Sequence, residues 1–409
     1  MRRPLPRHAR AALTALLVLG AFTAGCTAGR PILANATAPL PSLAPPTDPP
    51  VRVADPVPIV LPRDDGPHDR LSEWWYYTGH LDGTAAGGTM RKLGFEYVIF
   101  RAERGGFPTA WASHLALTDE TGDRFLYGQR LEVGAAVDRS PRADDGTPTG
   151  FDLSLSGVDP TDPATFEQPA WTMNGSDGSD RLSATLAPHE AAAAGSPDGL
   201  ALALDLEATK PAALHDRDGW IDFGPAGSSY YYSRTAMDAR GSVTFDGQQL
   251  TVTGQAWFDH QWGDFISVGG GGLDWFAVNL DDGTDLTLSL VRDADGSYPL
   301  IYGTIVDPDG RTRHLGRDDF SVEVTERWTS PETGADYPAG WTILIPSADD
   351  LRIDLRPTVA AQELDTRRTT GVVYWEGSQV VRGTRSGTPI GGEAYVELTG
   401  YAPSGSQSP

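Results

Sequence analysis

A regular alternation of apolar and polar residues most constrains the fold of this chain. Apolar side chains recur at every second position within residues 151–155, 200–206, 286–290 and 351–355. A period of two buries one face of a β-strand, whereas a helix needs an apolar residue every three or four positions. The alternation predicts an all-β protein, and the best helical candidate is the short segment His189–Ala194.

Turn signals separate these stretches. Asp-Gly pairs occur at residues 82–83, 145–146, 246–247, 282–283, 295–296 and 309–310, and the chain holds 47 glycines and 32 prolines. Asp-Gly favours the tight turns that join antiparallel strands. Many short strands joined in this way are typical of sandwiches and barrels.

The N-terminus has the pattern of an exported lipoprotein. Arginines precede an apolar run at residues 11–21, which is too short to span a bilayer, and small residues lead into Cys26, the only cysteine. We expect a signal peptide over residues 1–25, lipid attachment at Cys26 and a proline-rich tether over 26–57. The alternative is an incidental cysteine in a discarded signal. The expected location is the outer face of the bacterial cytoplasmic membrane or the cell envelope.

Charge narrows the possible partners. The formal net charge is −23, and the expected signal peptide carries arginines but no acids. Such a surface repels nucleic acids and anionic lipid headgroups. We therefore expect no nucleic-acid partner, membrane contact through the lipid anchor alone, and a monomer.

An internal duplication predicts two domains. Residues 73–83 resemble residues 274–283, and residues 241–247 match residues 371–377. A Gly-x-Ala-aromatic-x-acid pattern occurs at residues 254–259 and again at 392–397. The order is the same in both halves, which indicates two antiparallel barrels, over residues 58–266 and 267–405.

Aromatic-rich motifs carry a resemblance to a known family. EWWYYTGHL (73–81), AWFDHQWG (256–263), YWEG (374–377) and YVELTGY (395–401) resemble signatures of the carotenoid 1,2-hydratases and AttH-like secreted hydrolases. The resemblance covers roughly residues 60–403. It implies two tandem lipocalin-like β-barrels and an apolar ligand, isoprenoid or lipid. Family members include hydratases, hydrolases and cyclase-like enzymes, so it leaves the activity open.

The second motif contains the main catalytic candidates. Adding water to an alkene needs a strong acid and aromatic faces that stabilise a cation, and burial can turn a carboxyl into such an acid. Asp259 and His260 lie among Trp257 and Trp262 in this motif. The resemblance implies that His260 and Trp262 belong to the active site. It also implies an acidic proton donor further along the chain.

The proton donor stays open between two residues. Asp274 is the candidate downstream of the motif, and Asp259 is its rival. Neighbouring strand residues point to opposite faces, so His260 and Trp262 share one face and Asp259 lies on the other. Asp259 could equally serve the structure, by capping a turn or binding an arginine. Gln261 stands where the hydratase motif usually has a glutamate.

The remaining candidates also have structural alternatives. Glu73 is either a catalytic carboxyl or the buried partner of an arginine, and Glu376 and Glu397 are interpreted as structural. Further ligand-binding candidates are Trp75, Tyr77 and Tyr231. Trp75 could instead close the bottom of a barrel by packing.

Other chemistries lack their motifs. The sequence has no Gly-x-Ser-x-Gly nucleophile, no histidines at metal-ligand spacing and no glycine-rich phosphate loop. We therefore expect no metal and no nucleotide cofactor. The prediction is a hydratase-type lyase, and the alternative is a carrier of an apolar molecule. A buried carboxyl beside His260, unpaired with arginine or lysine and facing a cavity, would favour the enzyme.

Overall fold

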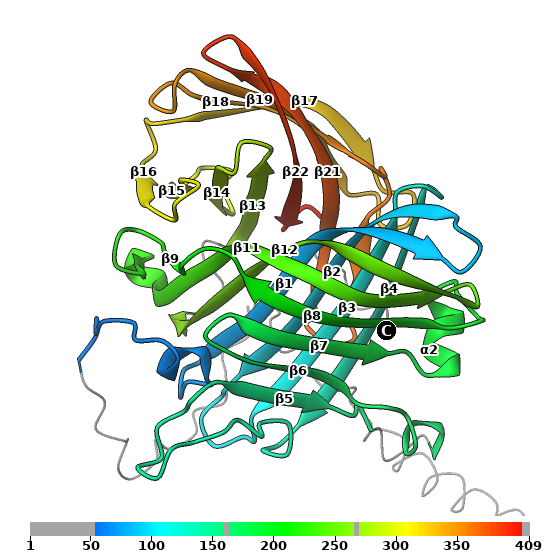
Figure 1. Ribbon diagram of the computed structural model, residues 1–409. Coiled ribbons are helices and arrows are strands. Elements are labelled where there is room, and N and C mark those ends of the chain that lie inside the picture. The colour runs from blue at the N-terminus through cyan, green and yellow to red at the C-terminus, as the bar shows by residue number, and fades with distance from the viewer. Residues whose placement is uncertain (1–53, 159–162, 266–269, 403–409) are drawn as a thin grey trace, which may run out of the picture.

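Two antiparallel β-sheets make up nearly all of the structure. The computed structural model describes residues 54–158, 163–265 and 270–402. The first sheet ends with β12 at Phe265, and the second begins with β13 at Gly270. In Figure 1 the first sheet is a nearly closed barrel and the second a half-barrel. The predicted all-β, tandem lipocalin-like fold is confirmed.

The first sheet has twelve strands, two of them side branches on β11. In sheet order, the main path is β4 (Arg124–Val133), β3 (Ala110–Asp119), β2 (Met90–Ala102), β1 (Ser72–Ala85), β12 (Gln248–Phe265), β11 (Gly227–Phe245), β8 (Leu200–Ala208), β7 (Ser179–Thr185), β6 (Trp171–Ser176) and β5 (Phe151–Leu155). The branches are β9 (Ala213–Leu214) and β10 (Trp220–Asp222). The last strand, β12, thus returns beside the first.

Side chains bridge the seam between the edge strands β4 and β5. Arg130 on β4 donates to the Pro169 carbonyl at 2.5 Å and pairs with Glu190 at 2.7 Å. Glu132 accepts from the backbone of Ser156 at 2.6 Å. Glu190 lies in α2 (Pro188–Ala193), where the sequence predicts a helix. These polar contacts replace the strand pairing that would close the barrel.

The second sheet has ten strands and the same return of its last strand to its first. In sheet order they are β16 (Thr312–Leu315), β15 (Leu300–Val306), β14 (Asp285–Asp293), β13 (Gly270–Leu280), β22 (Thr388–Thr399), β21 (Val373–Arg385), β19 (Leu351–Pro357), β18 (Asp336–Ile345) and β17 (Ser321–Thr329), with β20 (Glu363–Asp365) on β21. Its edges, β16 and β17, stay apart.

Helical structure is sparse. Besides α2, there are 3₁₀ turns η1 (Arg63–Asp65), η2 (Pro163–Thr165) and η3 (Gly224–Ala226). Among the described residues, no helix is long and apolar enough to cross a membrane.

Alternation along β1 gives the sheet two different faces. Trp75 and Tyr77 point into the first barrel and are fully buried in its core. Tyr76 points the other way and packs with Trp257, Trp275 and Tyr395 between the two sheets. The centre of the contact between the sheets is therefore aromatic, and it lies where the first and last strands of both sheets meet. Strands β2, β3 and β11 also contact the second sheet.

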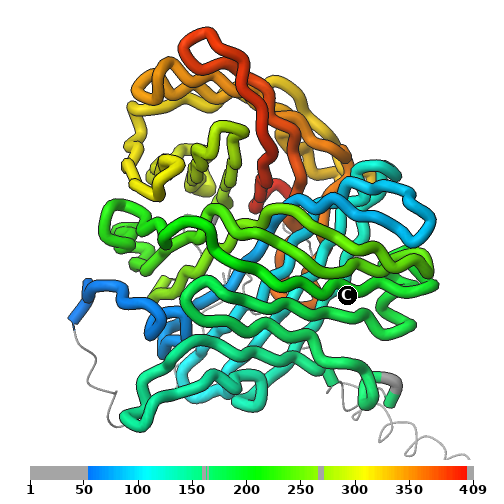
Figure 2. The backbone as a smooth tube through the Cα atoms, viewed as in Figure 1, coloured from blue at the N-terminus to red at the C-terminus, as the bar shows by residue number. Residues whose placement is uncertain are grey.

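Residues 54–71 cover one end of the first barrel (Figure 2). Val57, Ile59 and Leu61 pack against its core. The carboxylate of Asp65 accepts from the Tyr232 hydroxyl, and its carbonyl accepts from Trp75 at 2.9 Å. Cys26 and most of the expected tether lie outside the described residues.

The strand register corrects part of the predicted duplication. Gly254 pairs with Leu81 and Gly392 with Leu280, so residues 254–259 and 392–397 are structurally equivalent. In this register Trp275 corresponds to Tyr76, whereas the match made from the sequence pairs Trp275 with Trp74, two positions earlier. Residues 241–247 reach a hairpin turn, whereas residues 371–377 run into the middle of β21. That second match does not reflect equivalent positions.

Candidate functional site

A cavity of about 260 Å³ lies where the two sheets meet. Its wall is mainly aromatic, with Trp74, Tyr76, Phe100, Tyr231, Trp275 and Tyr302 contributed by both sheets. Two carboxyls, those of Asp259 and Glu397, also line it. Concave apolar sites with a few convergent polar groups are the usual form of small-molecule sites.

Asp259 is held by three donors. The Tyr231 hydroxyl donates to it at 2.5 Å, Trp257 Nε1 at 2.6 Å, and the Ser233 hydroxyl also donates. Burial raises the pKa of Asp259 to about 6, although these hydrogen bonds favour the charged form. Trp275 Nε1 in turn donates to Tyr231 at 3.1 Å and fixes that hydroxyl. The carboxyl is therefore oriented at the cavity wall.

Glu397 occupies the equivalent position in the second sheet. It is only partly buried because its side chain borders the cavity. Burial, and secondly the charge of Asp259, raise the pKa of Glu397 to about 7. At neutral pH, Glu397 is thus an acid that still holds a proton in a large share of molecules, beside a mostly ionised Asp259.

Two more glutamates extend this acidic cluster. Glu376 lies directly across from Glu397 in the β21–β22 ladder. Burial, together with the charges of Glu397 and Glu96, raises the pKa of Glu376 well above its usual range. Like charges directly opposite each other destabilise a sheet, so this pair retains at least one proton at neutral pH.

A chain of hydrogen bonds leads away from Glu96. The Tyr374 hydroxyl donates to Glu96 at 3.1 Å and lies 2.7 Å from His114 Nδ1. The other ring nitrogen of His114 lies 3.0 Å from the Thr369 hydroxyl. Burial lowers the pKa of His114 to about 3, so the ring is neutral. His114 adds no positive charge to the acids.

The acidic cluster at the cleft consists of four carboxyls, those of Glu96, Asp259, Glu376 and Glu397. In the described part of the chain, none of the four has a lysine, arginine or histidine within ion-pair distance. Buried carboxyls without a cation stay protonated well above their usual pKa. The cleft between the sheets can therefore store and deliver protons in apolar surroundings.

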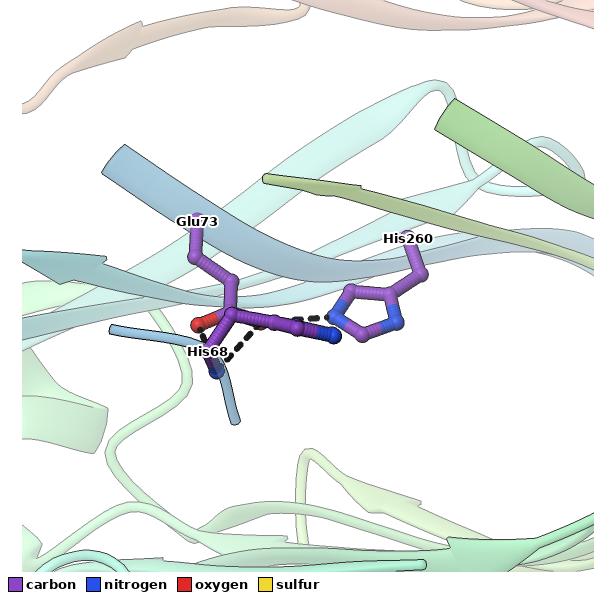
Figure 3. A group of neighbouring side chains, drawn as sticks. All are labelled: His68, Glu73 and His260. Carbon is purple, nitrogen blue, oxygen red and sulfur yellow. Dashed lines mark hydrogen bonds and ion pairs between the residues drawn. The ribbon is translucent and has the colours of Figure 1, made fainter. Parts of the chain in front are cut away.

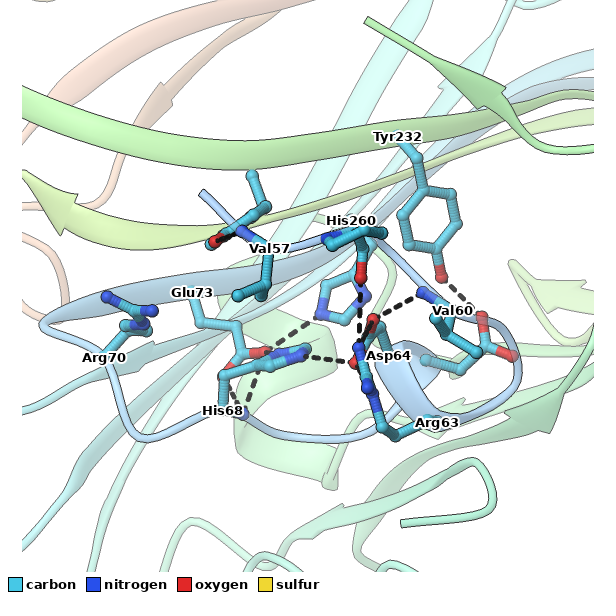
Figure 4. A network of polar contacts seen from close by, with 12 residues as sticks. Val57, Val60, Arg63, Asp64, His68, Arg70, Glu73, Tyr232 and His260 are labelled. Carbon is cyan, nitrogen blue, oxygen red and sulfur yellow. Dashed lines mark hydrogen bonds and ion pairs between the residues drawn. The ribbon is translucent and has the colours of Figure 1, made fainter. Parts of the chain in front are cut away.

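The structure separates the predicted catalytic pair. Asp259 faces the cleft, while His260 and Trp262 point together into the first barrel. His260 Nε2 lies 3.0 Å from Glu73, and His68 lies 2.7 Å from the same oxygen (Figure 4). The expected unpaired carboxyl exists, but it is not beside His260. The pleat of β12 places them on opposite faces.

Asp274, the candidate proton donor downstream of the motif, is paired with an arginine, unlike the acids of the cleft. It forms a salt bridge with Arg292 at 2.9 Å and accepts from the Tyr401 hydroxyl at 3.0 Å. Burial raises its pKa, with the charge of Arg292 opposing the shift. The pairing with Arg292 favours the charged form of Asp274, and burial outweighs that effect.

The other predicted ligand-binding residues divide between the two faces. Tyr231 lines the cleft, and Trp257 lies beside it as a donor to Asp259. Trp75 and Tyr77 are buried inside the first barrel, where Tyr77 donates to Asp180 at 2.9 Å. Only the first two are placed to act at the cleft.

Sequence reasoning interpreted Glu397 and Glu376 as structural and did not select Glu96. The duplication held a usable signal, because it aligns Asp259 with Glu397 at the end of the same pattern. Equivalent positions at the contact between two repeats are brought together by the packing. No signal along the chain links Glu96 to them.

Comparison with known proteins settles the family. The sequence model of AttH-like proteins matches residues 52–401. The chain belongs to the AttH-like family. The crystal structure of an AttH protein from Nitrosomonas europaea is 30% identical, with a TM-score of 0.67 over 88% of this chain and 100% of that one. No curated protein sequence matches.

Two more distant structures share the fold of this AttH-like protein. Kievitone hydratase from Nectria haematococca is 15% identical, with a TM-score of 0.59 over 84% of this chain and 93% of its own. CghA is 12% identical, with a TM-score of 0.51 over 92% of this chain and 98% of its own. At these identities the likeness concerns the fold alone.

Proposed function

We propose that this AttH-like protein is a hydratase-type lyase, which adds water across a C=C bond of an apolar, isoprenoid-like or lipidic molecule bound in the cleft. One observation carries the proposal. Glu397 and Asp259 line an aromatic cavity, have raised pKa values, and are unpaired with lysine or arginine in the described residues. Protonating an alkene carbon needs such an acid in water-poor surroundings.

The reaction follows from this arrangement. Glu397 gives its proton to one alkene carbon, whose π electron pair forms the new C–H bond, and the neighbouring carbon becomes a cation. Aromatic faces such as those of Tyr76 and Trp275 stabilise that cation by ~2 kcal/mol each when desolvated. Water then forms the C–O bond, and its surplus proton returns to the Glu397 carboxylate. The sum is the addition of one water.

Asp259 has a different part in this mechanism. Its three donors hold the carboxylate in place, so its negative charge is already oriented when the cation forms. Preorganised charge of this kind lowers a barrier without reorganisation during the reaction. Asp259 is therefore the counter-charge, and Glu397 the acid.

Isotope labelling tests the proposal. The purified protein is first examined by native mass spectrometry for a retained apolar molecule, and is then incubated with isoprenoid alkenes in ¹⁸O-labelled water. We expect ¹⁸O in an alcohol product, and a loss of ~100-fold or more for Glu397→Gln. Glu393→Gln, on the exposed part of the same strand, is the matched control and should act as wild type.

The carrier alternative gives the opposite result. A carrier would retain an apolar molecule, incorporate no ¹⁸O into any alkene, and bind equally well after Glu397→Gln. That combination would refute the proposed hydratase activity.

We also propose export and lipid anchoring at Cys26, supported by the N-terminal sequence pattern.

A further inference from the structure

A second polar cluster lies inside the first barrel, on the opposite face of β1 and β12 from the cleft. Glu73 Oε1 lies 2.7 Å from His68 Nδ1 and 3.0 Å from His260 Nε2. One ligand atom from each of these residues falls within 4.8 Å of the others. Figure 3 shows the three side chains close together, with a dashed line from the Glu73 carboxylate to the His260 ring. The proposed reaction does not use this group.

We propose that His68, Glu73 and His260 form a binding site for a divalent transition-metal ion of the zinc type. Two imidazoles and one carboxylate are a common ligand set for zinc and for non-haem iron, with the remaining positions left to water or substrate. Both rings already direct a nitrogen at one carboxylate oxygen. A metal ion would replace the shared protons with only small side-chain movements.

The surroundings hold the ligands in place. Asp64 lies 3.5 Å from His68 Nε2, the nitrogen that would face away from the metal, as second carboxylates do in many metal sites. Arg63 binds this carboxylate at 2.6 Å. The His68 ring stacks on Trp262 with ring centres 4.0 Å apart and planes 2° from parallel. The His68 ring is thus held on one face by Trp262 and at Nε2 by Asp64. It would lose little conformational entropy when Nδ1 binds a metal.

Burial leaves one route of entry. The side chains of Glu73 and His260 are 0% exposed, whereas that of His68 is 19% exposed. A hydrated ion would therefore arrive from the side of His68. Arg101 lies 3.9 Å from the other oxygen, Glu73 Oε2, and is itself paired with Glu103. The backbone N–H of His68 also donates to Glu73, at 2.9 Å to Oε2 and 3.2 Å to Oε1, and Oε1 is the oxygen that both imidazole rings approach.

The three ligands also come from separate parts of the chain. His68 precedes β1, Glu73 lies in β1, and His260 lies in β12. A metal here would fasten the segment of residues 54–71 to the barrel. The competing interpretation is a hydrogen-bonded cluster that fastens the same segment without any metal.

Metal titration separates these two interpretations. The full chain is prepared without a histidine tag in a Cys26→Ser background, which removes its only thiol and thus a competing zinc ligand. After chelator treatment it is titrated with Co²⁺, whose visible absorption reports coordination, and Zn²⁺ is used to displace the Co²⁺. We expect one ion per chain and a melting temperature that rises with free Zn²⁺.

Variants locate the site. Glu73→Gln and His68→Ala should each weaken binding by at least ~10-fold, the scale on which even outer-shell changes act. His189→Ala removes an exposed histidine from α2 and should bind as wild type. Near-ultraviolet circular dichroism identifies any misfolded variant. Because His68 is partly exposed, we expect the fold to tolerate His68→Ala better than Glu73→Gln.

Two outcomes would overturn the proposal. One is wild-type protein that binds less than one Co²⁺ per chain at millimolar metal. The other is a folded His68→Ala variant that binds Co²⁺ as tightly as wild type. Neither result bears on the cleft, because the ¹⁸O assay with Glu397→Gln tests that site independently.

Discussion

Single residues in the cleft determine where this protein holds protons. Asp259 and Glu397 both have raised pKa values, so the folded state binds protons that the unfolded chain has released. Stability must then fall as pH rises from the ordinary pKa of each carboxyl to its raised pKa in the folded state, because the unfolded state binds fewer protons there. Glu73 behaves in the opposite way. Its neighbours lower its pKa to about 2 despite burial, so its contribution to stability is lost as pH falls from about 4.5 to about 2.

This difference gives a prediction for Glu397→Gln that needs no substrate. The stability of wild type should decrease between about pH 4.5 and pH 7, and the stability of the variant should decrease less over the same range. At pH 8 we expect the variant to be more stable by about 1–3 kcal/mol, because one pKa unit corresponds to about 1.4 kcal/mol. Urea denaturation at several pH values measures this. Equal slopes for wild type, Glu397→Gln and the control Glu393→Gln would contradict it.

At the scale of strands, the two halves share a close approach that requires glycine. A Cβ at Gly254 would lie 1.9 Å from the His80 carbonyl, and one at Gly392 would lie 2.2 Å from the Asn279 carbonyl. These positions begin the repeated Gly-x-Ala-aromatic-x-acid pattern. The glycines let the last strand of each sheet approach the first, which places the acids at the cleft.

Gly254→Ala should therefore destabilise the protein by about 1–3 kcal/mol, the usual cost of forcing extra atoms into a packed region. Gly105→Ala is the control, since a Cβ there meets nothing within 4 Å. Thermal unfolding of both variants measures the difference. If Gly254→Ala melts at the same temperature as Gly105→Ala and wild type, the strands can separate at no cost and the prediction is wrong.

At the scale of the whole molecule, polar contacts join the two sheets. Lys210, which follows β8, lies 2.6 Å from Asp285 on β14, and both side chains are nearly buried. Thr235 also donates to Asp285 at 2.6 Å. Buried contacts of this kind, with the aromatic packing, make the sheets depend on each other.

Lys210→Met should cost about 3–5 kcal/mol, because it leaves a buried carboxylate without its cation. We expect a single unfolding transition in calorimetry for wild type and variant. The double variant Lys210→Met with Asp285→Asn should recover part of the loss. Two separate transitions, with only one shifted, would show that the sheets unfold independently.

Cys26→Ser tests the expected anchor. If Cys26 carries the lipid, the variant should leave the membrane fraction and appear in the soluble fraction of cells that make the full chain. An unchanged distribution between the two fractions would refute lipidation at this residue.

The sequence alone determined the class of fold, because a period of two and recurring Asp-Gly turns are local properties of the chain. It also placed the repeated glycine and acid patterns, and it showed that His260 and Trp262 share one face of a strand. Tertiary structure decided the rest. Glu96, Asp259, Glu376 and Glu397 meet only because two sheets pack outer face to outer face. His68 meets His260 because the segment before β1 covers the barrel. Spacing along the chain cannot reveal contacts made between strands almost two hundred residues apart, since packing and not local preference brings them together.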